Sequence, residues 1–409
     1  MGLFRNRQYS GEGSLTQLAM RRLRKDKFAV VSAFIILFAV LIAILGYLVT
    51  PDQTPFANEQ ILELSCRKPG SSVKLLYLNL PQDNSPVSWP AKMLWGEKNN
   101  YRAVPILSYR FEDNFIVVKA STGRDNPDGP ELKFSITDVL CGIPKADFVK
   151  NNKAGMVTFI DRKGRIISRD VKELQTELIE NNLVTRHYWL GTDRYGRDML
   201  SQLMIGTRVS LSVGFISVAI SLLIGLFLGS VAGFFGGRID ALITWLINVV
   251  WSIPTLLLVI AITFALGKGF WQVFIAVGLT MWVEVARVVR GQILSIREKE
   301  YVEAGKALGF RNPRIIFRHI LPNTLAPVIV ISAANFASAI LIEAGLSFLG
   351  IGVQPPMPSW GTMIKDNYGY IILDSAFLAI LPGLAIMIMV LAFMLIGNGL
   401  RDALDVKAT

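Results

Sequence analysis

Six apolar runs, each long enough to cross a lipid bilayer, constrain this chain more than any other feature. A transmembrane helix needs about 20 mainly apolar residues, and 52% of the 409 residues are hydrophobic whereas 18% are charged. The runs lie at residues 28–49, 209–235, 241–266, 270–289, 324–346 and 376–397. The sequence therefore predicts an all-α polytopic membrane protein with six transmembrane helices.

Basic residues predict the orientation of these helices. The tail 1–27 carries a cluster of Lys and Arg residues against only Glu12 and Asp26, and basic residues gather again between 287 and 318 and at Arg401. Because cytoplasmic loops are enriched in Lys and Arg, we expect both termini in the cytoplasm. The net charge of +11 then reflects topology rather than nucleic-acid binding. The first run is longer than the apolar core of a signal peptide, about 7–15 residues, so we interpret it as an anchor.

Between the first two runs, residues 50–185 have the composition of a soluble domain. Alternating apolar residues predict strands at Val73–Leu80, Phe115–Ala120, Leu132–Ile136 and, as a hairpin through Asp161–Gly164, at Met156–Ile160 and Arg165–Ser168. Val171–Asn181 is expected to be helical. We therefore expect a small β-rich (α+β) extracytoplasmic domain between helices 1 and 2, acting as a docking or packing surface. Cys66 and Cys141 both lie in it, and the sequence leaves open whether they form a disulfide.

A few polar residues interrupt the predicted spans. Pro254 must bend or break the third run, because proline lacks an N–H and clashes with the preceding turn. Asn335 and Glu343 are polar intrusions in the fifth, and these three residues are candidates for the substrate pathway. Glu284 and Arg287 lie at helical spacing near the predicted inner end of the fourth span, where we favour a structural ion pair over a substrate ligand.

A basic, helix-forming stretch between the fourth and fifth spans has the sequence EAGKALGFRNPRIIFRHILP. Glu300–Leu308 predicts one short helix, and Gly309 is suited to close it because glycine accepts a left-handed conformation. Asn312 and Pro313 predict the start of a second helix, which we expect to end near Pro322. Two short helices meeting at a glycine corner have a shape suited to docking into a cleft of another protein.

This stretch resembles the EAA loop of permease subunits of bacterial ATP-binding-cassette (ABC) importers. In that family the loop is the coupling helix that rests on the ATPase subunit. The resemblance implies a cytoplasmic coupling loop at 291–323, whose ATPase-coupling residues are Glu303, Ala304, Gly305, Gly309, His319, Leu321 and Pro322. Gly305 stands where the family usually has alanine, a change that weakens the helix by about 1 kcal/mol at most.

Two further segments are similar to the dipeptide, oligopeptide and nickel branch of these permeases. They are HYWLGTDRYGRDML at 187–200 and a segment at 343–361 that begins EAGLSFLG, so the resemblance covers a permease core at 186–405. It implies a C-type permease of the bacterial inner membrane that forms the translocation pathway with a homologous permease. The other implied partners are two ATPase subunits, which bind ATP and Mg, and an extracytoplasmic substrate-binding protein. Peptides are the leading cargo, with nickel, opines and peptide-like antibiotics still open.

The chain has no G-x-x-x-x-G-K-[ST] phosphate loop, so we expect no cofactor on it and ATP hydrolysis on separate subunits. It is interpreted as a transport subunit and not an enzyme. The alternative is an ion-coupled secondary transporter that uses Glu284 and Glu343 as relays. That alternative requires inverted repeats, which the sequence does not show. His187 and His319 are far apart in sequence, so no metal site is predicted.

Overall fold

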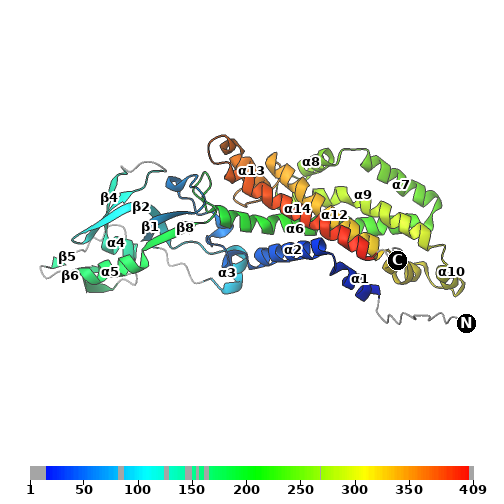
Figure 1. Ribbon diagram of the computed structural model, residues 1–409, viewed down its shortest axis with the longest axis horizontal. Helices are drawn as coiled ribbons and strands as arrows, with labels where there is room; N and C mark the ends of the chain where they lie inside the picture. The colour runs from blue at the N-terminus through cyan, green and yellow to red at the C-terminus, as the bar shows by residue number, and fades with distance from the viewer. Residues whose placement is uncertain are drawn as a thin grey trace, which may run out of the picture. The chain divides into compact units, whose positions relative to one another are not determined.

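The computed structural model describes residues 15–81, 87–123, 129–142, 150–152, 156–160, 165–267 and 269–404 (Figure 1). The chain divides into two compact units. We call the first the helical unit; it comprises Met1–Val40, Ser210–Gln354 and Gly383–Thr409. We call the second the mixed unit; it comprises Leu41–Val209 and Pro355–Pro382.

Five helices among the described residues are long and apolar enough to cross a membrane. They are α2 with a short extension (Lys27–Leu48), α6 (Met199–Phe235), α9 (Phe270–Ile296), the helix through α12 (Asn312–Phe348) and α14 (Phe377–Leu404). A bent pair, α7 (Gly237–Trp251) and α8 (Thr255–Leu266), makes a sixth if it is counted as one span. The predicted helical polytopic architecture is confirmed, although α6 begins earlier and α9 ends later than the apolar runs indicated.

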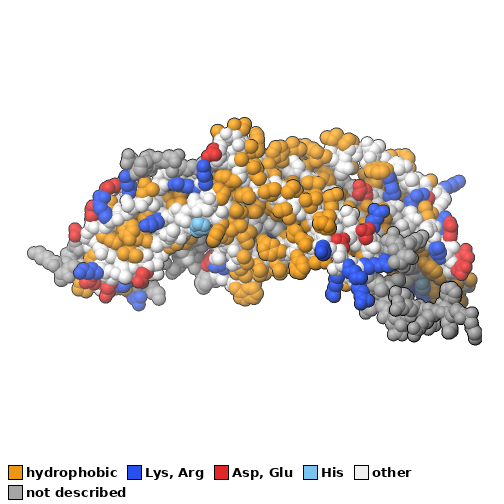
Figure 2. All heavy atoms as spheres, viewed as in Figure 1, with side chains coloured by type: hydrophobic (Ala, Val, Ile, Leu, Met, Phe, Trp, Pro, Cys, Tyr) orange, Lys and Arg blue, Asp and Glu red, His pale blue; other side chains and the backbone are white. Residues whose placement is uncertain are grey.

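The apolar helices expose their side chains as lipid contact requires. On α2, Phe28, Phe34 and Phe38 are all mostly exposed. Figure 2 shows hydrophobic side chains gathered over the middle of the long helices, whereas Lys, Arg, Asp and Glu mark the surface of the strands and the region near α1 and α10. In water such a surface would drive aggregation, but in hydrocarbon it is the stable arrangement.

The third predicted span is broken at the expected proline. α7 ends at Trp251 and α8 begins at Thr255, with an angle of 93° between the two helices. Pro254 has no N–H to donate, and its ring would clash with the carbonyl group four residues earlier in a straight helix. Ser252 closes α7 by donating its N–H to the carbonyl of Asn248 at 3.0 Å. The prediction that Pro254 interrupts the span is confirmed.

α9 is the most enclosed of the membrane-crossing helices and packs against α7, α8 and α12. α6 approaches it along a stripe of glycines at four-residue intervals, Gly225, Gly229 and Gly233. A methyl group on Gly229 would lie 2.6 Å from the carbonyl oxygen of Ala286 in α9. Small residues at this spacing let two membrane helices bring their backbones together. The stripe therefore fixes α6 against α9.

We expect Gly229→Leu to destabilise the helical unit by roughly 1–3 kcal/mol, because the new side chain must displace the backbone of α9. Gly291→Leu on α9 is the matched control, since a Cβ there meets nothing within 4 Å. The measurement is the fraction of purified chain that stays monodisperse in detergent after heating. If the two variants lost the same fraction of monodisperse chain on heating, the close packing of α6 on α9 would be contradicted.

The mixed unit is built on an antiparallel five-stranded sheet of order β4-β3-β2-β1-β8. Its strands are β1 (Ser71–Asn79), β2 (Tyr101–Glu112), β3 (Phe115–Ala120), β4 (Glu131–Ser135) and β8 (Leu183–Tyr188). A three-stranded sheet contains β5 (Lys150–Asn152), β6 (Met156–Ile160) and β7 (Ile166–Asp170). The last strand, β8, thus returns to pair with the first, with Val184 opposite Leu75.

Both faces of β1 are covered. Adjacent residues of a strand point to opposite faces, and the neighbours Leu75 and Leu76 are both fully buried. Leu76 belongs to a cluster with residues of α4 (Ile136–Cys141) and α5 (Val171–Asn181), whereas Leu75 packs with Tyr188 in a smaller cluster. The sheet is therefore the centre of the mixed unit.

The predicted strands fall on β1, β3, β4, β6 and β7, and the predicted helix Val171–Asn181 coincides with α5. β6 and β7 pair antiparallel, as a hairpin requires, although its turn at 161–164 lies outside the described residues. β2, β5 and β8 were not predicted. Cys66 and Cys141, whose pairing the sequence left open, are not joined by a disulfide.

Candidate functional site

The corner between α10 (Glu300–Ala307) and α11 (Asn312–Ile315) has the predicted glycine geometry. Gly309 has a φ of +73°, which residues with a Cβ adopt only with strain. Its N–H donates to the carbonyl of Lys306 at 3.0 Å, and the N–H of Phe310 donates to that of Gly305 at 3.1 Å. These two bonds are the Schellman motif, which ends a helix and turns the chain sharply. The predicted glycine cap is confirmed.

Aromatic and aliphatic contacts make this corner rigid. The ring of Phe310 stacks on that of His319 with centroids 5.9 Å apart, and the guanidinium of Arg314 lies 4.2 Å from the Phe310 centroid. Val302 of α10 and Ile315 of α11 are buried in one cluster with residues of α9 and α12. The buried cluster therefore joins the corner to two membrane helices.

The prediction that the second short helix ends near Pro322 is wrong. α11 continues through one π-helical stretch, Ile316–Ile320, directly into α12 (Leu321–Phe348). Pro322 cannot donate to the carbonyl of Arg318, so the helix widens just before it instead of stopping. The side-chain amide of Asn323 donates to the carbonyl of His319 at 2.7 Å, which replaces part of the lost backbone bonding.

The residues assigned to coupling by resemblance differ in exposure. Glu303, Ala304, Gly309 and Pro322 are exposed, His319 and Leu321 are half-buried, and Gly305 is buried. Sequence reasoning missed two large apolar side chains at the same corner: Leu308 is 73% exposed and Phe317 is 71% exposed. Large apolar residues next to the glycine and within the basic loop were the signal that could have found them.

Residues 187–200 form a hydrogen-bonded turn. Asp193 Oδ1 accepts from the backbone N–H groups of Tyr195 and Arg197, both at 2.9 Å, and its Oδ2 accepts from Arg197 Nε at 2.6 Å. Asp198 accepts from the backbone N–H of Ser201 at 2.8 Å. Burial raises the pKa of Asp198, and the hydrogen bonds from Ser201 oppose that shift.

Buried side chains hold this turn in place. Asp193 and Asp198 are buried, so they are not solvated charges, because their carboxylates organise the backbone of the turn. Tyr188 is only 1% exposed and packs against the sheet, so it is not an interfacial anchor; Trp189 is exposed. The sequence could not show this, since Tyr188 belongs to a strand, β8, that was not predicted.

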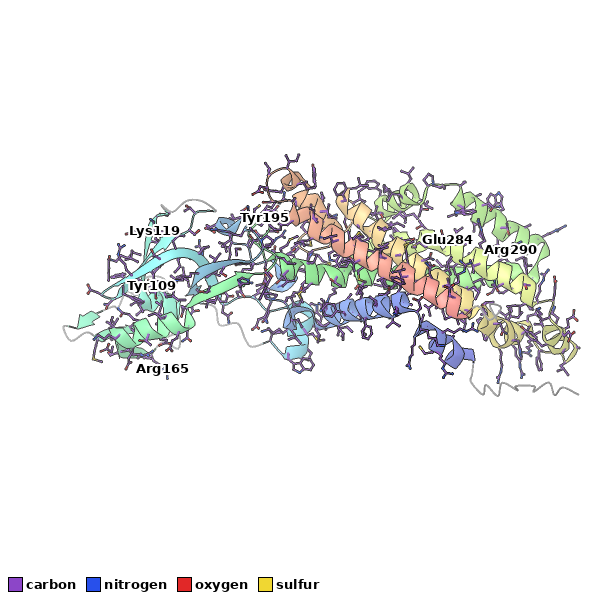
Figure 3. All side chains as sticks on the ribbon, in the orientation of Figure 1. Tyr109, Lys119, Arg165, Tyr195, Glu284 and Arg290 are labelled. Carbon is purple, nitrogen blue, oxygen red and sulfur yellow. The ribbon has the colours of Figure 1, made fainter. Side chains whose placement is uncertain are left out.

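The break between α7 and α8 opens a pocket of about 290 Å³ in the helical unit. Its lining combines apolar groups with one carboxyl group and three hydroxyl groups, and includes Trp251, Thr255, Thr280, Glu284, Ser338 and Leu341. These residues come from the broken pair, from α9 and from α12. Figure 3 shows Glu284 and Arg290 on α9.

The expected ion pair between Glu284 and Arg287 is not found. The guanidinium of Arg287 lies over the ring of Trp251, 3.2 Å from its centroid. Arg290 pairs with Asp240 of α7, with Nη2 and Oδ2 2.7 Å apart. Both interactions join α9 to α7, a neighbour that helical spacing within one span could not reveal. Because α9 continues to Ile296, Glu284 also lies near the middle of the helix rather than near its inner end.

The three candidate pathway residues lie in different surroundings. Pro254 is exposed at the helix break, whereas Asn335 and Glu343 are buried in α12. Glu343 Oε1 accepts from the hydroxyl of Ser347 at 2.6 Å. The structure does not bring the three together in one pocket, and their role in transport stays a prediction.

Two family models match the chain. Residues 225–409 match the inner membrane component of binding-protein-dependent transport systems, and residues 14–64 match the N-terminal TM domain of oligopeptide transport permease C. Residues 65–224, which include all the strands described, lie outside both models.

Several transport proteins are similar to this chain. It is 44% identical over 220 residues to the dipeptide transport system permease protein DppC of Alkalihalophilus pseudofirmus, covering 54% of this chain and 72% of that protein. It is 40% identical over 220 residues to the glutathione transport system permease protein GsiD of Pectobacterium atrosepticum, covering 54% and 73%. The oligopeptide transport system permease protein OppC of Bacillus subtilis is 39% identical over 223 residues, with coverage of 54% and 73%.

Long apolar helices, a broken span with a pocket, and a rigid exposed corner define a polytopic transport permease of the membrane. With these matches, the chain belongs to the family of inner-membrane permease subunits of binding-protein-dependent ABC importers, among the C-type permeases. It is therefore a multi-pass protein of the inner membrane. A permease of this family implies a partner permease and ATPase subunits.

Proposed function

We propose that this chain and a homologous permease form the pathway through which short peptides are imported at the expense of ATP. The observation that carries the proposal is the similarity to permeases named for dipeptides, oligopeptides and glutathione, at 39–44% identity. All three names describe short peptides. Transport of a peptide by alternating access requires no bond to be made or broken on this chain, so the chain itself is not an enzyme.

The corner at Gly309 is the contact with an ATPase subunit in this proposal. Leu308 and Phe317 present apolar side chains on a rigid support, which suits insertion into a cleft. ATP and Mg bind to the two ATPase subunits, whose closure moves the corner. Because Val302 and Ile315 share a buried cluster with α9 and α12, this movement tilts the helices that line the pathway.

We place both termini in the cytoplasm and residues 50–185 outside, where an extracytoplasmic binding protein delivers the cargo. Basic residues precede α2 and close α14, as cytoplasmic ends require. Counting six spans from there puts the inserted residues and the connection 349–376 on the same, outer side. These two segments contact each other in the mixed unit, where Lys68 Nζ lies 2.9 Å from Asp374 Oδ2.

The test begins with gentle purification of the tagged chain in detergent and identification of what co-purifies. We expect a second permease and two copies or kinds of ATPase subunit. Reconstituted with the binding protein, the complex should hydrolyse ATP faster when peptide is present and should accumulate labelled dialanine in proteoliposomes. A chain that purifies alone and moves solute under an ion gradient without ATP would overturn the proposal and favour a secondary transporter.

A further inference from the structure

Glu284 places a carboxyl group in the membrane without an ionic partner. It lies near the middle of α9, and among the residues that the structure describes it forms no ion pair. The two arginines that follow it on α9 are engaged with Trp251 and Asp240. Ionisable residues inside a membrane are normally paired or mark the path of a substrate. No ion pair among the described residues therefore explains Glu284 as a structural residue.

The surroundings of Glu284 are those of a small binding site. Its carboxyl group is exposed to the pocket at the helix break, together with the hydroxyl-bearing residues Thr255 and Ser338. Pockets for small molecules measure roughly 300–1,000 Å³, so a pocket of about 290 Å³ is at the lower end of this range and suits the first residues of a short peptide. Apolar residues such as Leu341 and Met281 complete the wall and suit an uncharged side chain.

The start of α8 adds hydrogen-bond donors to the same pocket. α8 begins at Thr255, and its first backbone bond runs from Leu258 to Pro254 at 3.1 Å. The N–H groups before Leu258 therefore have no acceptor inside the helix, and no side chain caps them. Broken membrane helices commonly direct such ends at transported solutes. A carboxyl group and free N–H groups together match the ammonium group and the first carbonyl oxygen of a peptide.

We propose that Glu284 binds a primary ammonium group of the transported peptide, its N-terminal α-ammonium, as the cargo passes the break between α7 and α8. The inference rests on the proposed function of peptide import. The contact is an ammonium–carboxylate hydrogen bond, which is stronger than a hydrogen bond between neutral groups.

The test is uptake of labelled dialanine by proteoliposomes that contain the complete transporter, its binding protein and ATP. Glu284→Gln should lower uptake about 10- to 100-fold, the usual effect of losing a hydrogen bond to a charged group. Glu284→Asp should restore a large part of it. Hydrolysis of ATP in the absence of peptide should be unchanged in both variants, which separates a lost contact from a damaged assembly. Glu180→Gln, an exposed carboxylate on α5, is the matched control.

Uptake by Glu284→Gln within about twofold of the unmodified transporter would overturn the inference, since a lost charged hydrogen bond is worth more. Absence of uptake by the unmodified transporter would instead overturn the proposed function. Alanyl-lysine separates two sources of the ammonium group. An equal loss for dialanine and alanyl-lysine supports the N-terminus, whereas a loss confined to alanyl-lysine assigns Glu284 to a basic side chain and overturns the N-terminal assignment.

A second variant covers the case in which Glu284→Gln does not assemble. Ser338→Cys places a thiol in the same pocket, and it is compared with the unmodified chain, whose Cys66 and Cys141 form no disulfide. With Glu284 intact, a cationic thiol reagent should react faster with this cysteine than an anionic reagent of equal size, and excess dialanine should slow the reaction. Equal rates without protection by peptide would contradict a cation site at Glu284.

Discussion

Gly309→Val should reduce peptide uptake at least about 10-fold while the chain still inserts and purifies normally. At a φ of +73° a β-branched side chain strains the backbone by about 1–3 kcal/mol. Nothing lies within 4 Å of the position of a Cβ on Gly309, so the strain comes from the backbone alone and not from a clash. The variant chain relieves this strain by breaking the Schellman hydrogen bonds. α10 then separates from α11, and their packing against α9 and α12 loosens.

Two control variants test this explanation. Gly309→Asn should keep most of the uptake, because asparagine tolerates the left-handed region. Gly345→Val lies within helix α12, where a Cβ also meets nothing within 4 Å and φ is ordinary, so it should affect uptake much less than Gly309→Val. The readout is the ratio of peptides transported to ATP hydrolysed. Unchanged uptake by Gly309→Val would rule out the corner as the mechanical link.

Features set by local sequence were predictable. The spans follow from apolar length, the break follows from Pro254, and the cap follows from Gly309. The same rules could not predict that the helix continues through Pro322. A proline ends many helices, but here one π-helical stretch and the side chain of Asn323 accommodate it, and the choice depends on the packing of Ile315 and Ile320 against α9.

Features set by contacts between helices cannot be predicted from local sequence. Helical spacing alone favoured a pair between Glu284 and Arg287, but Arg287 finds the ring of Trp251 on another helix. Arg290 likewise finds Asp240, which lies 50 residues earlier. Only a folded chain shows which of several possible cations is already engaged. That information changes Glu284 from half of an ion pair into a candidate ligand for cargo.

The glycine stripe of α6 was detectable but overlooked. Gly225, Gly229 and Gly233 form a small-xxx-small pattern in an apolar helix, which predicts close helix packing. The sequence could not name the partner helix, which the structure identifies as α9 through the approach of Gly229 to Ala286. The pattern predicts that a contact exists, and the fold determines where it is made.

In the mixed unit, Glu59→Ala should lower the free energy of unfolding by about 3–5 kcal/mol, the usual effect of breaking a buried ion pair. The side chains of Glu59 and Arg186 are each only 12% exposed, and Arg186 donates from Nη1 to Glu59 Oε2. Asn99 donates to the other carboxylate oxygen at 2.8 Å. Burial raises the pKa of the Glu59 carboxyl, while Arg186 opposes that shift. The variant leaves the guanidinium of Arg186 enclosed without a counter-ion.

The measurement is the urea midpoint for unfolding of the full-length chain in detergent, followed by the fluorescence of its tryptophans and by proteolysis of the mixed unit. Glu131→Ala is the matched control, because Glu131 pairs with Arg110 through two bonds of 2.7 Å but both side chains are largely exposed. In Glu131→Ala, water replaces the carboxylate as the partner of Arg110, so we expect no measurable shift in the urea midpoint. Replacing Glu59 by Met together with Arg186 by Leu should recover most of the stability, because an apolar pair carries no desolvation penalty. If Glu59→Ala and Glu131→Ala had the same effect, the enclosed pair would not be what joins the segment after α2 to strand β8.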